Sequence, residues 1–248
     1  MVSGLGEAVN LPPLSHLLLW RDPVARGGLE SMAVDEVLLS CGASSVMRAY
    51  AWGRPTVTYG YFDSEDSARQ IFPDGGIEFV RRWTGGGIVD HRHDIPFSLA
   101  LRWEDRPGRP VAPSLYRWIH GGLARVLKDC GVACEMLTGD APDGGRACFS
   151  SPVTSDLILP GGDKLARGGQ RRSQQGVLHQ GSIQNCLLLE GWDLILAKRL
   201  CDEVQVCDAL EPFEGFSEAV SRLLEEKYGR KDWNNGGRRR SLGGTERK

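Results

Sequence analysis

The sequence predicts an α+β fold in which a mixed, mainly antiparallel sheet packs on helices. Its candidate strands occur in neighbouring blocks with helices inserted between the blocks, whereas a doubly wound fold alternates strands and helices one by one. The glycines at 85–87 also lack the GxGxxG spacing of a dinucleotide-binding loop, and no helical pattern follows them. A chain of 248 residues is long enough to bury a sizeable single core.

The first half of the chain is expected to be rich in strands. The apolar run "HLLLWRD" (16–22) is typical of a short strand, and apolar residues recur at helical spacing over 27–42 until Gly42 ends the helix. Strand-forming runs at 46–52 and 56–62 flank "GRP" and are predicted to pair. The face of the first helix consists of Leu29, Met32, Ala33, Val37 and Ser40. The remaining elements of this half are a short helix at 64–72 and strands at 77–83, 87–91 and 94–103.

The second half is expected to begin with the longest helix. This helix covers 112–131, with a proline near its start and Gly131 at its end, as is usual for these two residue types. A strong strand pattern occupies 176–189. The shorter elements are strands at 133–137, 155–159 and 164–168, and helices around 192–200 and 216–229.

One domain is expected over residues 15–228. The residues before it (1–14) are interpreted as a leader that contains prolines. The stretch after it (229–248) is polar, rich in glycine and basic, so a flexible basic tail is predicted there.

Composition and charge are typical of a cytoplasmic protein. The chain is 41% hydrophobic and 25% charged with a formal net charge of −2, which argues against nucleic acid as the main partner. The opening residues show no signal-peptide pattern, and the apolar runs are too short to span a membrane. Seven irregularly spaced cysteines fit reduced thiols better than a disulfide framework. Cys130 and Cys134 lack a second pair of ligands at zinc spacing, so no metal site is expected.

The segment "RRWTGGGIVDH" (81–91) contains three consecutive glycines next to Arg82 and Thr84. Glycines remove every Cβ from a turn, so backbone amides can approach a ligand closely and positive φ angles are available. An anion or a polarised carbonyl would fit beside the arginine. The competing interpretation is a hairpin turn, although such a turn needs at most two special residues. These residues alone leave ligand binding and a plain turn equally open.

A second segment, "ACFSSPVTSDLILPGGDKLARGGQRRSQQGVLHQGSI" (147–183), combines a cysteine with a lysine. Cys148 is expected in a loop and Lys164 in a short strand. A thiol held partly as thiolate by a nearby amine can carry an acyl group as a thioester. A single cysteine is more often inert packing, so the residues alone favour that role.

Together these segments resemble a known family. "VRRWTGGGIVDH", "DKLARGGQRR" and "GVLHQGSI", with "MAVDEVLL" and "RAYAWGRPTVTYGYF" upstream, are similar to the catalytic domain of the lipoate-protein ligase and octanoyltransferase superfamily, which also contains biotin-protein ligases. The likeness covers roughly residues 15 to 200 in the expected order. It implies a biotin/lipoate protein ligase-like fold, related to class II aminoacyl-tRNA synthetases, with an acyl tunnel that ends at the glycines.

The resemblance also implies roles for individual residues. Lys164 matches the lysine that contacts the acyl carbonyl, and Cys148 in "ACFSSP" matches the cysteine of one octanoyltransferase branch. The residues that match the loop around the carbonyl or acyl-adenylate are Arg82, Thr84, Gly85, Gly86 and Gly87. The further residues expected to bind substrate are His91, Asp156, Gln170 and His179.

Two chemistries follow from the resemblance. In the transferase branch, a cysteine takes octanoate from octanoyl-acyl carrier protein as a thioester and passes it to a lysine of a lipoyl domain, with no cofactor. The acceptor is then the glycine cleavage H protein or a 2-oxo acid dehydrogenase E2. In the ligase alternative, ATP and Mg²⁺ activate free lipoate as an adenylate. Many ligases carry a C-terminal domain that has no room after residue 228, which favours the transferase.

Several positions depart from the family pattern. Asp94 stands where ligases often have asparagine, Arg167 where glycine is usual, and His179 one place before the transferases' histidine. His91 and His179 fit a structural role as well as substrate contact, and Asp156 fits either a partner of Lys164 or a strand-end acid. A non-catalytic relative that binds acylated carriers is a second alternative. Biotin ligation is disfavoured, because the loop lacks the arginine-rich pattern of those enzymes.

Overall fold

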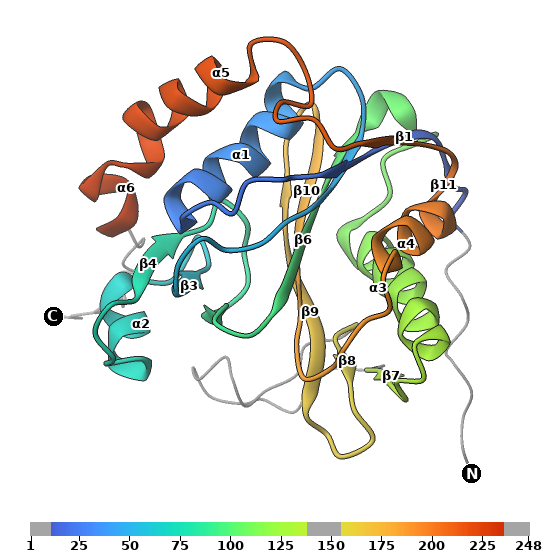
Figure 1. The fold of residues 1–248 in the computed structure, drawn as a ribbon, viewed down its shortest axis with the longest axis horizontal. Helices are drawn as coiled ribbons and strands as arrows, with labels where there is room; N and C mark the ends of the chain where they lie inside the picture. The colour runs from blue at the N-terminus through green and yellow to red at the C-terminus, as the bar shows by residue number, and fades with distance from the viewer. Residues whose placement is uncertain (1–10, 138–154, 236–248) are drawn as a thin grey trace, which may run out of the picture.

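The computed structural model describes residues 11–137 and 155–235. Figure 1 shows these residues as a twisted sheet with helices on both faces. In chain order the elements are β1 (Leu14–Arg21), α1 (Gly28–Cys41), β2 (Val46–Ala49), β3 (Thr56–Tyr59), α2 (Glu65–Ile71), β4 (Glu78–Arg81), β5 (Val89–Asp90), β6 (Ile95–Arg102), the 3₁₀ helix η1 (Trp103–Asp105), α3 (Ala112–Asp129), β7 (Glu135–Met136), β8 (Leu157–Ile158), β9 (Lys164–Arg172), β10 (Gly176–Ile183), α4 (Trp192–Leu200), β11 (Cys201–Cys207), α5 (Phe216–Leu223), the π-helical segment η2 (Leu224–Tyr228) and α6 (Lys231–Asn235).

The strands form two sheets. The large sheet has the order β11-β1-β2-β6-β10-β9-β8-β7, and the small one the order β4-β3-β5. β1 is parallel to β11 and β2, and β3 is parallel to β4, whereas the remaining pairs are antiparallel. The predicted α+β class, with a mixed and mainly antiparallel sheet, is therefore confirmed.

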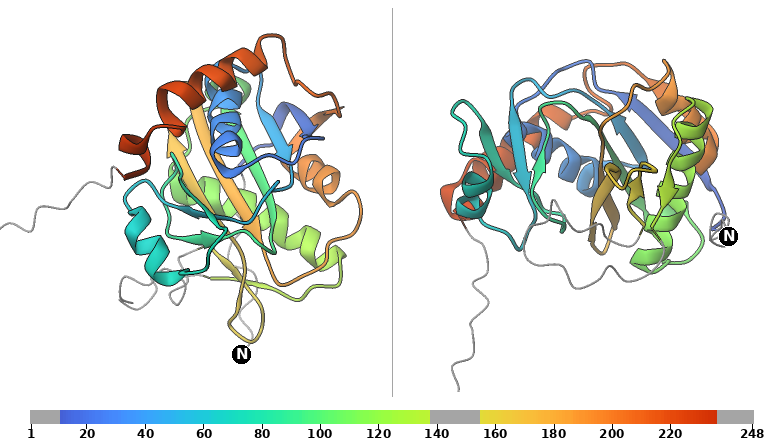
Figure 2. Two further views of the ribbon diagram at one scale, coloured as in Figure 1. Left: turned by 60° about the vertical axis from the view of Figure 1, so that its left-hand side comes forward. Right: turned by 90° about the horizontal axis from the view of Figure 1, so that it is seen from below.

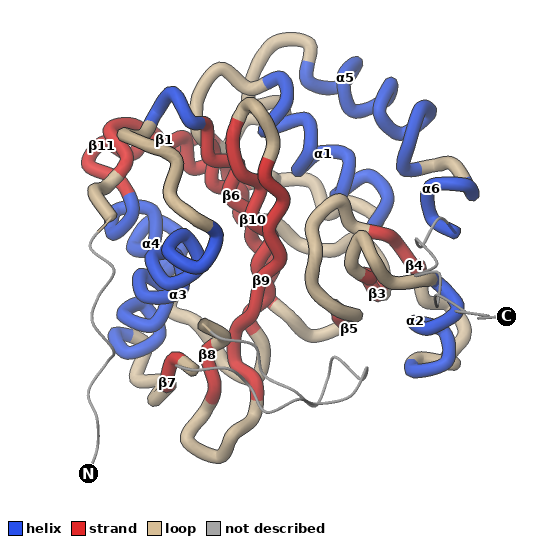
Figure 3. The backbone as a smooth tube through the Cα atoms, turned by 180° about the vertical axis from the view of Figure 1, so that it is seen from behind, coloured by secondary structure: helices blue, strands red, loops and turns tan. Residues whose placement is uncertain are grey.

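Helices cover both faces of the large sheet (Figure 3). α3 and α4 enclose one core cluster, and α1 packs on the opposite face, where α5 covers it in turn. Because α1 lies between the sheet and α5, it is buried around most of its circumference, and Val34 and Leu38 are both fully buried. The sequence predicted a single apolar face for this helix, whereas the buried surface extends beyond that face to include Val34 and Leu38. Figure 2 shows the small sheet and α2 (teal) grouped together at one side of the molecule.

The predicted pairing of residues 46–52 with 56–62 is wrong. β2 pairs with β1 and β6 in the large sheet, while β3 belongs to the small sheet. The connecting segment does not fold back on itself, because Trp52 bridges to Arg26 and the Gly53 amide donates to the Arg26 carbonyl at 2.7 Å. Residues 50–55 thus carry the chain from one sheet to the other.

The end of the chain also differs from the expectation. β11 was not anticipated, and it pairs in parallel with β1 at the edge of the large sheet. The strand predicted at 176–189 ends at Ile183. Within the stretch expected to be a flexible tail, α6 is a short helix whose Trp233 and Asn234 bond to β4. The apolar indole of Trp233 gives this polar segment a surface to pack.

Candidate active site

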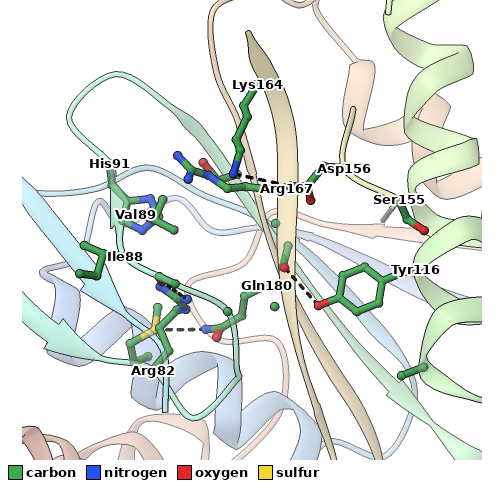
Figure 4. Close-up of a pocket in the computed structure, with 18 of the residues that line it drawn as sticks. Arg82, Ile88, Val89, His91, Tyr116, Ser155, Asp156, Lys164, Arg167 and Gln180 are labelled. Carbon is green, nitrogen blue, oxygen red and sulfur yellow. Dashed lines mark hydrogen bonds and ion pairs between the residues drawn. The ribbon is translucent and has the colours of Figure 1, made fainter. Parts of the chain in front are cut away.

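A cavity of about 510 Å³ lies between the small sheet, α1, α3 and the strands β9 and β10. Its apolar wall consists of Met32, Tyr50, Trp52, Ile88, Val89, Ala112, Pro113 and Tyr116. Its polar and charged side chains are Arg82, His91, Ser155, Asp156, Lys164, Arg167, Gln180 and Ser182. Figure 4 shows Lys164, Arg167 and Asp156 close together on one side of the cavity, and Arg82 and Gln180 on another.

The glycine loop, residues 84–87, is not a hairpin turn. It connects β4 to β5, and these two strands lie on opposite edges of β3. The loop therefore crosses over the end of β3 and reaches the cavity, which Gly86 and Gly87 line. Gly86 has a φ of +94°, a conformation that glycine adopts readily. Of the two interpretations open from sequence, the hairpin is excluded.

The loop backbone also packs closely against other backbone. A Cβ on Gly60 would lie 1.7 Å from the Gly86 carbonyl oxygen, and a Cβ on Gly169 would lie 2.4 Å from the Gly85 carbonyl oxygen. The Gly85 amide donates to the Gln170 carbonyl at 3.3 Å. Glycines on both sides of the contact thus let the loop settle between residue 60 and β9.

Arg82, two residues before this loop, holds the loop backbone in place through hydrogen bonds. Its guanidinium donates to the Gly87 carbonyl at 2.7 Å, to the Gly85 carbonyl at 3.2 Å and to Thr58 Oγ1 at 2.6 Å. The side chain is 5% exposed and also lines the cavity. Charge-assisted bonds of this kind are about twice as strong as neutral ones, so the arginine fixes the loop carbonyls and leaves its positive charge beside the cavity.

A buried chain of hydrogen bonds connects the loop to α1. Thr84 Oγ1 donates to Gln180 Oε1 at 2.7 Å, and Gln180 Nε2 donates to Asp35 Oδ2 at 2.7 Å. Because a carboxylate only accepts, it fixes the orientation of the Gln180 amide. Asp35 in turn accepts from Arg48, whose guanidinium also binds Asp22. Thr84 is therefore held by a fully connected network that starts in the core.

Lys164 begins β9 and points into the cavity beside Asp156. The Lys164 Nζ lies 3.9 Å from Asp156 Oδ2, and the two side chains are 14% and 8% exposed. Tyr116 from α3 donates its hydroxyl to the Gly168 carbonyl at 3.1 Å, next to this pair. Burial raises the pKa of Tyr116, so the phenol stays protonated at neutral pH. The arrangement presents an ammonium group to whatever occupies the cavity.

His91 lines the cavity and is held at both ring nitrogens. Its Nε2 lies 2.7 Å from Thr58 Oγ1, and its Nδ1 lies 2.6 Å from Asp94 Oδ2. Asp94 also accepts from the Trp52 indole at 3.1 Å and from Ser182 Oγ at 2.6 Å. The aspartate that stands where ligases often have asparagine is thus the centre of a polar network on this wall.

Gln170 and His179 lie outside the cavity lining. His179 is fully buried against Phe97 and His120 on the α3 side of β10. Gln170 Nε2 lies 3.3 Å from His179 Nδ1, so these two residues contact each other. Burial, with a smaller contribution from His120, lowers the pKa of His179 well below its ordinary value, and burial also lowers the pKa of His120.

The two lowered pKa values predict that stability falls as the solution becomes acidic. Below pH 6.5 unfolding therefore takes up protons on these histidines, most strongly on His179, and the free energy of unfolding falls as the pH falls. Urea unfolding between pH 7 and pH 5 measures this slope. His179→Gln is expected to make this slope shallower, because glutamine does not take up a proton in this pH range. An equal slope in the wild type and the variant would contradict the assignment.

The structure brings together some of the residues proposed from sequence. Those that line the cavity are Arg82, Gly86, Gly87, His91, Asp156 and Lys164. Thr84 and Gly85 complete the glycine loop behind this surface. Cys148 lies outside the described residues. Three lining residues were not predicted from the sequence: Gln180, Ser182 and Tyr116. For the first two a signal was available, because side chains alternate along a strand and Gln180 and Ser182 therefore face away from His179.

Clusters of metal-binding side chains and membrane-spanning helices are both absent from the described part of the chain. Residues 11–137 and 155–235 contain no group of three or more His, Cys, Asp and Glu side chains arranged to hold a metal ion. No helix within these ranges combines the length and apolar character that crossing a membrane requires.

Two curated proteins of similar sequence are octanoyltransferases LipM. The one from Symbiobacterium thermophilum is 34% identical over 183 residues, which is 66% of this chain and 64% of the relative. The one from Moorella thermoacetica is 32% identical over 213 residues, which is 79% of this chain and 76% of the relative. The chain therefore spans just under two thirds of the first relative and about three quarters of the second.

A solved structure supports the fold independently of sequence. The crystal structure of lipoate-protein ligase A bound with ATP superposes with a TM-score of 0.67 at 18% identity, over 91% of this chain and 99% of that one. At this identity the likeness shows the fold alone. The family model of the lipoyl protein ligase A/B catalytic domain matches residues 28–214, which include the glycine loop, Lys164 and the strands around the cavity. The chain therefore belongs to the lipoyl protein ligase A/B catalytic domain family.

Proposed function

We propose that this protein transfers an octanoyl group to a lysine of a lipoyl-domain protein. One observation carries the proposal: a single cavity combines an apolar wall with Lys164 and the glycine loop. The two octanoyltransferase relatives support the same reaction. The acyl chain would lie against Met32 and Ile88, and burying it contributes about 0.8 kcal/mol for each methylene.

The polar side of the cavity suits an acyl carbonyl. When a nucleophile attacks a thioester, negative charge develops on the carbonyl oxygen, and preorganised donors stabilise that charge best in a site shielded from water. Lys164 supplies a cation for this oxygen, and Asp156 holds the ammonium in position. Arg82 adds positive potential and keeps the glycine loop in the shape that admits the substrate.

Cys148 is the proposed acyl carrier, on the basis of the motif "ACFSSP". The Cys148 thiol gives up its proton, and the thiolate attacks the thioester of octanoyl-acyl carrier protein. The new sulfur–carbon bond forms, the carbon–sulfur bond to the carrier breaks, and the carrier thiolate takes up the released proton. The neutral amine of the acceptor lysine then attacks the enzyme thioester, the carbon–sulfur bond to Cys148 breaks, and the amide forms with release of one proton to solvent. The Cys148 thiolate leaves and is ready for the next cycle.

This scheme needs no cofactor, because one thioester is exchanged for another and the final amide is more stable than either. Free lipoate, in contrast, is a carboxylate whose activation requires ATP with Mg²⁺. We propose octanoyl-acyl carrier protein as donor, and the glycine cleavage H protein or a 2-oxo acid dehydrogenase E2 as acceptor. The proposed catalytic domain spans 15–228, and the proposed setting is the cytoplasm.

Acylation of the protein without ATP tests this function. After incubation with octanoyl-acyl carrier protein, intact mass measurement is expected to show one octanoyl adduct on the wild type and none on Cys148→Ser. Cys41→Ser is the matched control, because Cys41 is an exposed thiol that does not line the cavity. This variant should keep the adduct.

A different outcome would support the ligase alternative. If only lipoate with ATP modifies a lipoyl domain, and Cys148→Ser retains that activity, transfer through a thioester is rejected. If neither donor leads to modification of a carrier domain, the non-catalytic alternative holds instead. Titrating ATP against the Cys148→Ser variant separates these results.

A further inference from the structure

The short helix α6 covers the outer edge of β4. Within the small sheet β4 pairs only with β3, so its other edge has no strand partner among the described residues. α6 occupies this side (Figure 1). The Arg81 amide donates to Asn234 Oδ1 at 3.2 Å, and the Trp233 indole donates to the Arg81 carbonyl at 3.3 Å. Two side chains thus replace the bonds that a neighbouring strand would make.

The Arg81 side chain strengthens the same contact. Its guanidinium donates to the Trp233 carbonyl at 2.9 Å and to the Tyr61 carbonyl at 3.1 Å, and it lies 4.8 Å from the Trp233 ring centre. The residue is 3% exposed. Leaving a buried cation without one of its hydrogen-bond acceptors costs free energy, and here the acceptors are backbone carbonyls. Moving α6 would therefore cost free energy, because the buried Arg81 guanidinium would lose its acceptor on Trp233.

Arg81 is followed in the chain by Arg82, which organises the glycine loop. The Arg82 amide donates to the Tyr59 carbonyl at 2.8 Å, and the Tyr59 hydroxyl donates to the Asn234 carbonyl at 2.8 Å. The end of β4 is thus held between β3 on one side and α6 on the other. Arg81, which is hydrogen-bonded to α6, is therefore directly followed by Arg82, which is hydrogen-bonded to the glycine loop.

We infer that Trp233 and Asn234 are positioning residues for the glycine loop. They set the position of Arg82 through Arg81 and thereby place the loop against the acyl carbonyl. This inference rests on the proposed function for its catalytic consequence. α6 lies beyond residues 28–214, the part of the chain that the family model matches.

The test compares point variants of the full chain. Trp233→Ala removes the indole donor and the ring, and Asn234→Ala removes the acceptor for the Arg81 amide. Asn234→Asp keeps that acceptor oxygen and loses the amide that donates to the Tyr228 carbonyl at 2.8 Å. Asp232→Ala is the matched control, because Asp232 pairs with Arg230 at the exposed surface of the same helix, with side chains 68% and 56% exposed.

Trp233→Ala and Asn234→Ala are expected to lower kcat for octanoyl transfer by about 10- to 100-fold, as small displacements of positioning groups do. KM should change less than kcat, because the apolar wall is unaltered. Asn234→Asp should recover part of the rate that Asn234→Ala loses, because it restores the acceptor for the Arg81 amide, and Asp232→Ala should match the wild type. Hydrogen exchange should accelerate in a peptide covering residues 82–90 but not in one covering 95–102.

Two results would overturn the inference. The first is a kcat for both alanine variants within a factor of two of the wild type. The second is an equal rise in exchange over 82–90 and 95–102, which would mean that α6 only adds general stability. If the wild type transfers no octanoate, the proposed function fails, and the exchange comparison still decides whether α6 positions the loop.

Discussion

Replacing Lys164 with methionine is expected to lower kcat for octanoyl transfer by about 10²- to 10³-fold, the usual cost of losing one group that stabilises a developing oxyanion. Methionine keeps most of the aliphatic volume and removes the charge. The cavity should therefore keep its shape, and the acyl chain should still bind. In the proposed mechanism the acyl carbonyl then loses its cation, in a largely buried site where charges interact strongly.

Steady-state kinetics with octanoyl-acyl carrier protein and a lipoyl domain measure this change. Lys128→Met serves as the control, because Lys128 is an exposed residue of α3 that does not line the cavity. A Lys164→Met enzyme as fast as the control would remove Lys164 from the mechanism. Impaired activity alone would not separate the transferase from the ligase, since both chemistries place this lysine at the acyl carbonyl.

Replacing Arg48 with methionine is expected to reduce the unfolding free energy by about 3–5 kcal/mol, the cost of removing one partner from a buried ion pair. Arg48 lies 2.7 Å from Asp22 Oδ2 and 2.9 Å from Asp35 Oδ1, and all three side chains are 0% exposed. Without Arg48, the buried Asp35 carboxylate loses its ion pair, whereas Asp22 keeps Arg26 at 2.9 Å. The substitution should also disturb the cavity lining, because Asp35 orients the Gln180 amide.

Denaturant unfolding at neutral pH measures this loss. Arg69→Met is the matched control, since Arg69 pairs with Glu65 one turn away on α2 and its side chain is 55% exposed. An exposed pair of this kind contributes about 0.3–0.5 kcal/mol. If Arg48→Met costs no more than Arg69→Met, the buried network does not support the fold in the way described.

Local patterns were enough to predict most elements and part of the site. The α+β class and the lining residues Arg82, Gly86, Gly87, His91, Asp156 and Lys164 follow from strand blocks, glycine placement and the family resemblance. Pairing between distant segments was harder to predict. The strand patterns at 46–52 and 56–62 are local, whereas the sheet that each joins depends on contacts made much later in the chain.

The same limit applies to the site residues on β10. Each residue in this strand is buried, so burial does not distinguish the two faces, and His179 attracted attention as a titratable group. The strand's alternation sends His179 toward α3 and Gln180 toward α1, where Asp35 and Thr84 complete its hydrogen bonds. The sequence alone does not show which neighbour each face will meet. The position of α6 was missed for the same reason.

The most direct measurement is a crystal structure of the protein with an octanoyl group bound. The acyl chain is expected to lie along the apolar wall beside Met32 and Ile88, with its carbonyl oxygen within hydrogen-bond distance of Lys164 Nζ and next to the glycine loop. An octanoyl chain bound outside this cavity, or inside it with its carbonyl directed away from Lys164, would contradict the account.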